Sequence, residues 1–167
     1  MRKYQILISA LVVSLDALTK GMVRGHITFD QSVIVFPGFF NLTHLQNTGA
    51  AFSMFADGGR LTAIALIVFS CVAIAVIVYL LWKSGSGLNS TTMALALIAG
   101  GALGNLWERA LRGSVTDFLD LYIGQQHWPP FNLADSAICV GAALLLITIM
   151  SAKPPQEKQG QTEEGRS

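Results

Sequence analysis

The chain has 167 residues, of which 52% are hydrophobic and 13% are charged, whereas a soluble domain carries about 25% charged residues. Leu61 to Trp82 holds 22 residues without a charge, and about 20 apolar residues span a bilayer. These features exclude an ordinary soluble domain, and the net charge of +1 gives no indication of a nucleic-acid partner. We expect one membrane-embedded domain over residues 1–152.

Four stretches are long and apolar enough to form membrane-spanning helices. They run from about Tyr4 to Val23, from Leu61 to Trp82, from Ser90 to about Arg109 and from Phe131 to Met150. The first begins like a signal peptide, but Asp16 interrupts it and no convincing small-residue cleavage site follows. We therefore expect an uncleaved anchor helix.

An even number of spans places both termini on the same side of the membrane. The polar turn from Lys83 to Asn89 makes the second and third helices antiparallel. Lysines and arginines are divided almost evenly between the two sides, but those that directly flank spans lie on the side of the termini: Arg2, Lys3, Lys83 and Lys153. The positive-inside rule thus favours cytoplasmic termini. Residues 153–167 are polar and Pro-containing, which predicts a disordered cytoplasmic tail.

The segment between the first two spans, at about residues 24–59, does not follow a helical pattern. A β-branched run from Ser32 to Phe36 ends at the turn signal Pro37-Gly38, and a strand-like alternation continues from Phe39 to Leu45. We expect a small sheet on the outer membrane surface, where aromatic rings are favoured. The predicted fold class is an all-α membrane protein with four transmembrane helices and this small sheet.

Asp117 and Asp135 are conspicuous because ionisable groups in or near apolar spans are costly. Asp135 is the only charge in the 20 residues from Phe131 to Met150, and Asp117 closely follows the third apolar stretch. We expect both near one membrane face. A close pair of carboxylates shares one proton, so one acts as a base toward water while the other acts as an acid. Proton-coupled transport is the alternative, although no inverted repeat is visible.

Other polar residues are predicted to lie near this pair. Asp16 and Lys20 are one helical turn apart, which is typical either of a neutralising ion pair or of a pair that positions other polar groups. Asn105 and Arg109 share a helix face, and a guanidinium there suits an anionic headgroup or a carboxylate. Asn132 lies on the same helix face as Asp135.

Several features favour structural interpretations. The spacing of Gly100 and Gly104 permits close helix approach. Glu108 and Arg112 are four residues apart, which predicts an ordinary ion pair on a helix surface.

The cysteines and histidines give no indication of chemistry. Cys71 and Cys139 lie within apolar runs and are expected to act as small buried hydrophobic residues. His26, His44 and His127 have no metal-ligand spacing and are expected in solvated or interfacial positions.

Five blocks, in this order, resemble the lipoprotein signal peptidases (signal peptidase II). They are Asp16-Ala17-Leu18-Thr19-Lys20, Asn47-Thr48-Gly49-Ala50-Ala51-Phe52, Gly101-Ala102-Leu103-Gly104-Asn105-Leu106-Trp107-Glu108-Arg109, Val115-Thr116-Asp117-Phe118 and Phe131-Asn132-Leu133-Ala134-Asp135-Ser136. The resemblance extends over nearly the whole of Met1 to Met150. Two positions depart from the family's usual pattern: Glu108 replaces a common Asp, and Thr116 replaces a frequent Val.

The resemblance implies an aspartyl endopeptidase of the bacterial inner membrane, with a four-helix bundle and a periplasmic β-cradle. Its substrate would be a diacylglyceryl-modified prolipoprotein, cut immediately before the lipidated cysteine, and globomycin would inhibit it. Asp117 and Asp135 match the catalytic positions. Residues that match positions shaping the site or contacting substrate are Asp16, Asn47, Gly49, Asn105, Arg109 and Asn132; Lys20, beside Asp16, is expected to join them. The only other partners expected are membrane lipids, and no metal or cofactor is expected.

Overall fold

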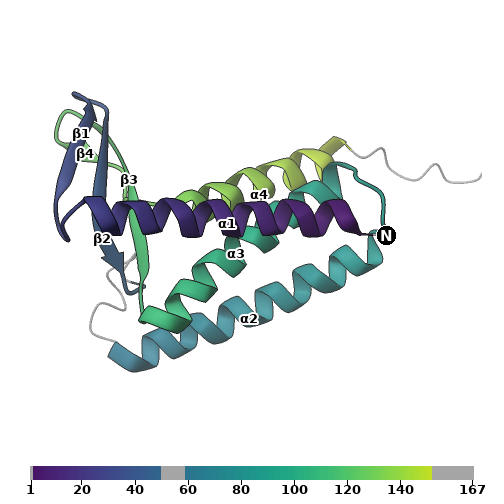
Figure 1. The fold of residues 1–167 in the computed structure, drawn as a ribbon. Helices are drawn as coiled ribbons and strands as arrows, with labels where there is room; N and C mark the ends of the chain where they lie inside the picture. Colours follow the sequence, from purple (N-terminus) through teal and green to yellow (C-terminus); the bar gives the residue numbers. More distant parts are fainter. Residues whose placement is uncertain (1, 50–58, 152–167) are drawn as a thin grey trace, which may run out of the picture.

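The computed structural model describes residues 2–49 and 59–151. Its elements follow the order α1 (Lys3–His26), β1 (Ser32–Phe36), β2 (Phe40–Asn47), α2 (Gly59–Lys83), α3 (Ser90–Arg112), β3 (Val115–Ile123), β4 (Gln126–His127) and α4 (Leu133–Ser151). Figure 1 shows the helices as an elongated bundle with the sheet across one end and the N-terminus at the opposite end. The predicted tail, 153–167, and the end of the second sequence block, 50–52, lie outside the described residues.

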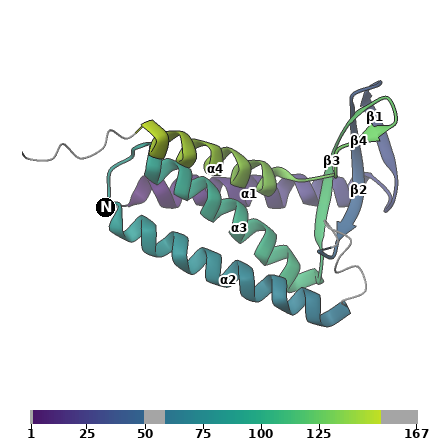
Figure 2. The same cartoon turned by 180° about the vertical axis from the view of Figure 1, so that it is seen from behind.

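Helix α3 packs against each of the other three helices. Seen from the reverse side in Figure 2, it crosses the bundle between α4 and α2. A Cβ on Gly100 would lie 2.9 Å from the Ser9 carbonyl oxygen of α1, and one on Gly101 would lie 2.3 Å from the Ala134 carbonyl oxygen of α4. These two glycines therefore let α3 approach both neighbours closely. The close approach predicted from Gly100 and Gly104 is confirmed, since a Cβ on Gly104 would lie 2.8 Å from Asp16 Oδ2 of α1.

Both ends of α3 carry capping residues. Asn89 and Thr92 form a reciprocal capping box at its start. At its end Gly113 adopts φ +76°, a left-handed conformation that closes the helix and is easy only for glycine. The chain can then reverse directly into β3.

The sheet is antiparallel with the order β1-β2-β3-β4. The strands predicted around Ser32–Phe36 and Phe39–Leu45 are confirmed as β1 and β2. The prediction missed half of the sheet, because β3 and β4 come from the segment between α3 and α4. β3 follows α3 and is buried along its first four residues, so its sequence lacks the alternation of a one-sided strand.

Three helices are long and apolar enough to cross a membrane: Lys3–His26, Leu61–Lys83 and Leu133–Ser151. The mainly helical fold with a small antiparallel sheet is confirmed. α3, the fourth predicted span, does not meet the same measure within the described residues. Its second half carries Asn105, Glu108 and Arg109, which face polar partners instead of lipid.

Two minor predictions were wrong. Cys71 and Cys139 are exposed on the helix bundle instead of buried, since a span surrounded by lipid needs no polar outer face. His44 is 7% exposed, and its Nδ1 lies 2.8 Å from the Ile27 carbonyl oxygen. It is thus a buried link between β2 and the end of α1 instead of a solvated histidine.

Candidate active site

The two conspicuous aspartates lie at the sheet end of the bundle on different elements. Asp117 is the third residue of β3 and is 4% exposed. Asp135 is in the first turn of α4. The backbone of Phe131 pairs with Leu119 of β3, with Leu119 N–H donating to the Phe131 carbonyl over 2.8 Å. This bridge holds the start of α4 against β3, and it explains why the helix begins at Leu133 instead of at the predicted Phe131.

Asn132 connects the two carboxylates. Its side-chain Nδ2 donates to Asp117 Oδ1 over 2.8 Å. Its backbone N–H donates to Asp135 Oδ2 over 3.2 Å, and its Oδ1 accepts the Asp135 N–H over 2.9 Å. Asn132 is completely buried, so this bridge is fixed by packing as well as by hydrogen bonds.

Each carboxylate oxygen of the pair accepts one amide N–H. The other Asp117 oxygen, Oδ2, accepts from Asn47 Nδ2 over 2.9 Å, and Asp135 Oδ1 accepts from Asn105 Nδ2 over 2.7 Å. Gly49 N–H in turn donates to Asn47 Oδ1 over 2.8 Å. Gly49 has φ +103°, a backbone conformation that a side chain would strain. The asparagines and Gly49 predicted as site residues therefore converge on the aspartates.

Burial of Asp117 raises the pKa of its carboxyl to about 6. The hydrogen bond from Asn47 opposes this rise, the negative charge of Asp135 adds to it, and Asn132 and Lys20 lower the pKa again. Asp117 therefore holds a proton more readily than an exposed aspartate at the pH of most cellular compartments.

A second polar cluster lies behind Asn105. Lys20 Nζ is 2.8 Å from Asp16 Oδ2, which confirms the predicted ion pair, and 3.0 Å from Asn105 Oδ1. Asp16 Oδ1 accepts the Ala134 N–H over 3.0 Å. Asp16 and Lys20 are each 1% exposed. The pair thus neutralises its own charges and also connects α1 to α3 and α4.

Arg109 lies on α3 within electrostatic reach of both Asp135 and Asp117. Its Nε is buried and has no hydrogen-bond partner among the residues that the structure describes. Leaving a buried guanidinium donor without a hydrogen-bond partner is costly.

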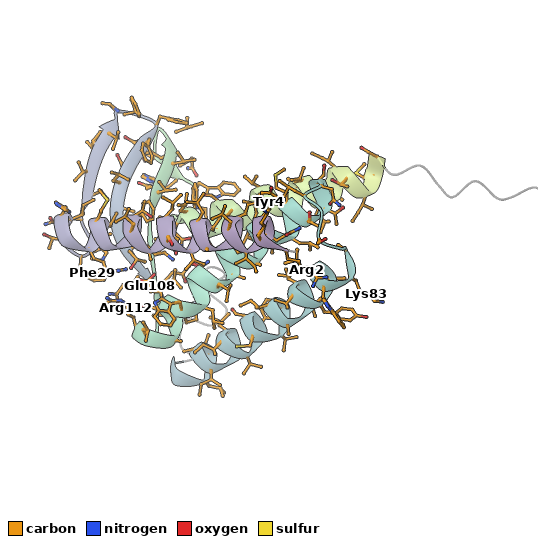
Figure 3. The ribbon with its side chains drawn as sticks, turned by 45° about the vertical axis from the view of Figure 1, so that its right-hand side comes forward. Arg2, Tyr4, Phe29, Lys83, Glu108 and Arg112 are labelled. Carbon is orange, nitrogen blue, oxygen red and sulfur yellow. The ribbon has the colours of Figure 1, made fainter. Side chains whose placement is uncertain are left out.

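The sequence interpretation missed Glu108 as a member of this region. Glu108 is 6% exposed and binds Lys20 and Arg24 of α1, not Arg112 as predicted. Its two cationic partners are 88 and 84 residues away in the chain, whereas the i, i+4 rule finds only neighbours along one helix. Figure 3 shows Glu108 and Arg112 toward the sheet end of the bundle, with Arg2 and Lys83 at the other end.

Asp120 supports the sheet instead of the aspartate pair. It is 6% exposed, accepts from Asn41 Nδ2 over 2.9 Å and lies 2.8 Å from His127 Nδ1. The His127 ring also stacks on Tyr122 at 4.8 Å between centroids. These contacts hold β4 and its turn against β3.

The fold and the buried carboxylates define a small helical membrane protein with a polar site at one end of its bundle. A family model described as signal peptidase (SPase) II matches residues 8–151. The chain is 40% identical over 147 residues to the lipoprotein signal peptidase of Solibacter usitatus, covering 87% of this chain and 90% of that relative. It is 42% identical over 154 residues to that of Francisella tularensis subsp. novicida, covering 90% and 93%.

Two solved structures of bacterial membrane enzymes are also similar to this chain. One bacterial membrane enzyme, solved in meso at 1.9 Å, superimposes with a TM-score of 0.79 and 31% identity over 90% of this chain and 95% of that one. A second, at 2.3 Å, gives a TM-score of 0.80 and 31% identity over 93% and 94%. The chain belongs to the signal peptidase II family of aspartic peptidases. It is a multi-pass membrane enzyme of a family that cleaves signal peptides from prolipoproteins.

Proposed function

We propose that Asp117 and Asp135 are the catalytic pair of an intramembrane endopeptidase. Its substrate is a diacylglyceryl-modified prolipoprotein, which it cuts immediately before the lipidated cysteine. The observation that carries this proposal is the Asn132 bridge, which binds both carboxylates while Asp117 is almost fully buried. Paired carboxylates held in this way can supply both the base and the acid of peptide hydrolysis.

The surroundings of the two aspartates support different roles. Asp135 lies in the first turn of α4, where the helix dipole favours a carboxylate. Asp117 is the buried member whose pKa is raised to about 6. We therefore assign the base to Asp135 and the shared proton to Asp117.

In the first step Asp135 removes a proton from water as the water oxygen bonds to the scissile carbonyl carbon. Asp117 donates its proton to the developing oxyanion, which gives a neutral tetrahedral intermediate. In the second step Asp117 takes that proton back as the carbonyl re-forms. The C–N bond breaks, and the proton on Asp135 passes to the leaving amine. Both carboxyl groups then have their original protonation states.

Arg109 is proposed to bind the substrate next to this pair, because its Nε has no partner in the described part of the chain. Asp16, Lys20, Asn47, Gly49, Asn105 and Asn132 shape the site. Anchoring by the substrate's lipid fixes the scissile bond at one membrane depth and raises its local concentration. Globomycin is proposed to inhibit the enzyme at the same pair.

We further propose that all four helices span the bacterial inner membrane as one domain over residues 1–152. Both chain ends, including the tail 153–167, would then be cytoplasmic. The sheet would lie at the periplasmic surface as a cradle, and its exposed Phe36, Phe39 and Trp128 suit a lipid interface. α3 can cross because its polar residues bind α1 and β3 instead of lipid.

The test is cleavage of a lipidated precursor by the purified enzyme, with products identified by mass spectrometry. We expect Asp117→Asn and Asp135→Asn each to abolish cleavage while the folded protein remains in membranes. An unlipidated precursor is the matched substrate control and should be cut poorly. Substantial activity in either variant would contradict the catalytic assignment, and equal cleavage of both precursors would contradict the lipid dependence.

A further inference from the structure

Glu108 is a buried carboxylate with four close polar contacts to two other elements. Its Oε2 accepts the Thr116 N–H over 3.0 Å, and its Oε1 accepts the Thr116 hydroxyl over 2.7 Å. On the α1 side, Oε1 lies 2.5 Å from Arg24 Nη1 and Oε2 lies 3.3 Å from Lys20 Nζ. Glu108 therefore ties α1 and β3 to α3 at a single side chain.

The contacts of Glu108 connect it indirectly to both aspartates, to Asp117 through Thr116 and to Asp135 through Lys20 and Asn105. Thr116 directly precedes Asp117 in β3, so its two bonds to Glu108 fix the backbone that carries Asp117. On the other side Lys20 binds both Glu108 and Asn105 Oδ1. That bond orients the Asn105 amide so that its Nδ2 donates to Asp135.

The side-chain lengths in this contact are matched. Glu108 reaches the Thr116 N–H and hydroxyl together, one with each oxygen. Aspartate is one methylene shorter and would leave the Thr116 hydroxyl, on a residue only 2% exposed, without this acceptor. Valine at 116 has nearly the same shape and no hydroxyl to satisfy.

We propose that Glu108 is a positioning residue for both carboxylates and that it works as a coupled pair with Thr116. This inference rests on the proposed function of Asp117 and Asp135, but it concerns a residue that contacts neither of them directly. The charged groups around Glu108 are Lys20 and Arg24 of α1, with Asp16 next to Lys20, and Arg109 of α3. Glu108→Gln therefore leaves Arg24 without its carboxylate partner, while Lys20 keeps only Asp16.

The experiment uses the purified full-length protein with four variants: Glu108→Gln, Glu108→Asp, Thr116→Val and the double variant Glu108→Asp with Thr116→Val. Arg112→Gln is the matched control, since Arg112 is an exposed residue of the same helix. The readouts are kcat, KM, the pH profile of kcat/KM and the thermal midpoint. Activity of the wild-type protein, and its loss in Asp117→Asn, establish the proposed function independently of these variants.

For Glu108→Gln we expect kcat to fall about 100-fold, since a small displacement of reacting groups has this effect. KM should stay within about twofold, because no substrate contact is removed. The pH profile should shift, while Arg112→Gln should match the wild type. An unchanged kcat and pH profile in folded Glu108→Gln protein would overturn the proposal.

The double variant tests the pairing even where a single variant folds poorly. We expect Glu108→Asp alone to lose activity and the addition of Thr116→Val to restore most of it, because the unsatisfied hydroxyl is then gone. If the activity losses of the two single variants simply add in the double variant, this result would overturn the proposed coupling between Glu108 and Thr116. So would a loss of activity in Glu108→Asp that matches the unfolded fraction, because a positioning role requires folded protein with a lowered kcat.

Discussion

Asn132 and Asp135 bind each other twice, with the backbone N–H of each residue donating to a side-chain oxygen of the other. This reciprocal contact is a capping box at the start of α4. The carboxylate in this box, Asp135, is also a member of the proposed catalytic pair. A helix cap ordinarily serves stability alone. Here the same bonds also set the direction in which Asp135 points.

Replacing Asn132 with alanine should therefore affect stability and activity together. The variant loses the cap of α4, which costs about 1 kcal/mol of unfolding free energy, and it loses the amide that binds Asp117. We expect kcat to fall about 100-fold and the thermal midpoint to drop by a few degrees. Ser136→Ala is the control, because among the described residues its hydroxyl bonds only to the Asn132 carbonyl. Equal kcat values in the two variants would contradict the bridging role.

The pH dependence of kcat/KM should reflect the proton on Asp117. Only the protonated carboxyl can donate to the oxyanion, and its pKa is raised to about 6. Activity should therefore decline above about pH 6, by roughly tenfold per pH unit. The measurement is kcat/KM from pH 5 to 8 with a lipidated precursor. A rate that rises steadily over this range would show that Asp117 acts as the base.

The same carboxyl should make folding stability depend on pH. Its pKa is raised from 3.8 in an unfolded chain to about 6 in the folded protein, so the folded state binds the proton more tightly. The resulting stability is fully present below pH 3.8 and is lost as the pH rises through about 6. The loss is roughly 3 kcal/mol. Thermal midpoints of the wild type and of Asp117→Asn should diverge over this range, and parallel curves would contradict the assignment.

Lys20→Met should be one of the most destabilising changes in the bundle. It leaves the carboxylates of Asp16 and Glu108 buried without their shared cation, and breaking a buried ion pair costs about 3–5 kcal/mol. The double variant with Asp16→Asn should recover part of the loss, since one unpaired charge is removed. Denaturant unfolding in detergent measures both. A double variant less stable than Lys20→Met would contradict this account.

Gly101→Ala should separate α3 from α4. The added methyl group would lie 2.3 Å from the Ala134 carbonyl oxygen, next to Asp135. We expect a lower thermal midpoint and at least about a tenfold loss of kcat, because α4 must move with its aspartate. Gly21→Ala in α1 is the control, since nothing lies within 4 Å of its added Cβ. That control should be neutral or slightly stabilising, and equal effects would rule out a role for close helix packing.

The sequence predicted the helices and the first two strands, because each depends on local pattern. It also predicted that other polar residues lie near the aspartate pair. Hydrophobic length marks α1, α2 and α4, and the turn at Pro37-Gly38 separates β1 from β2. It did not predict β3, whose buried start is shared with the helix bundle. It also misplaced Glu108, because the cations that pair with it come from α1 instead of from its own helix.

The Asp16 contact with Ala134 joins residues 118 positions apart, and Asn47 reaches Asp117 across 70. Contacts of such high sequence separation form late, because a long stretch of chain must be ordered first. α1, α2 and α3 can thus be synthesised while the chain still lacks Asp135. The carboxylate pair is completed only when α4 docks against the rest. A partly made or misassembled molecule would therefore lack the proposed catalytic pair, and under that proposal hydrolysis would begin only in the finished fold.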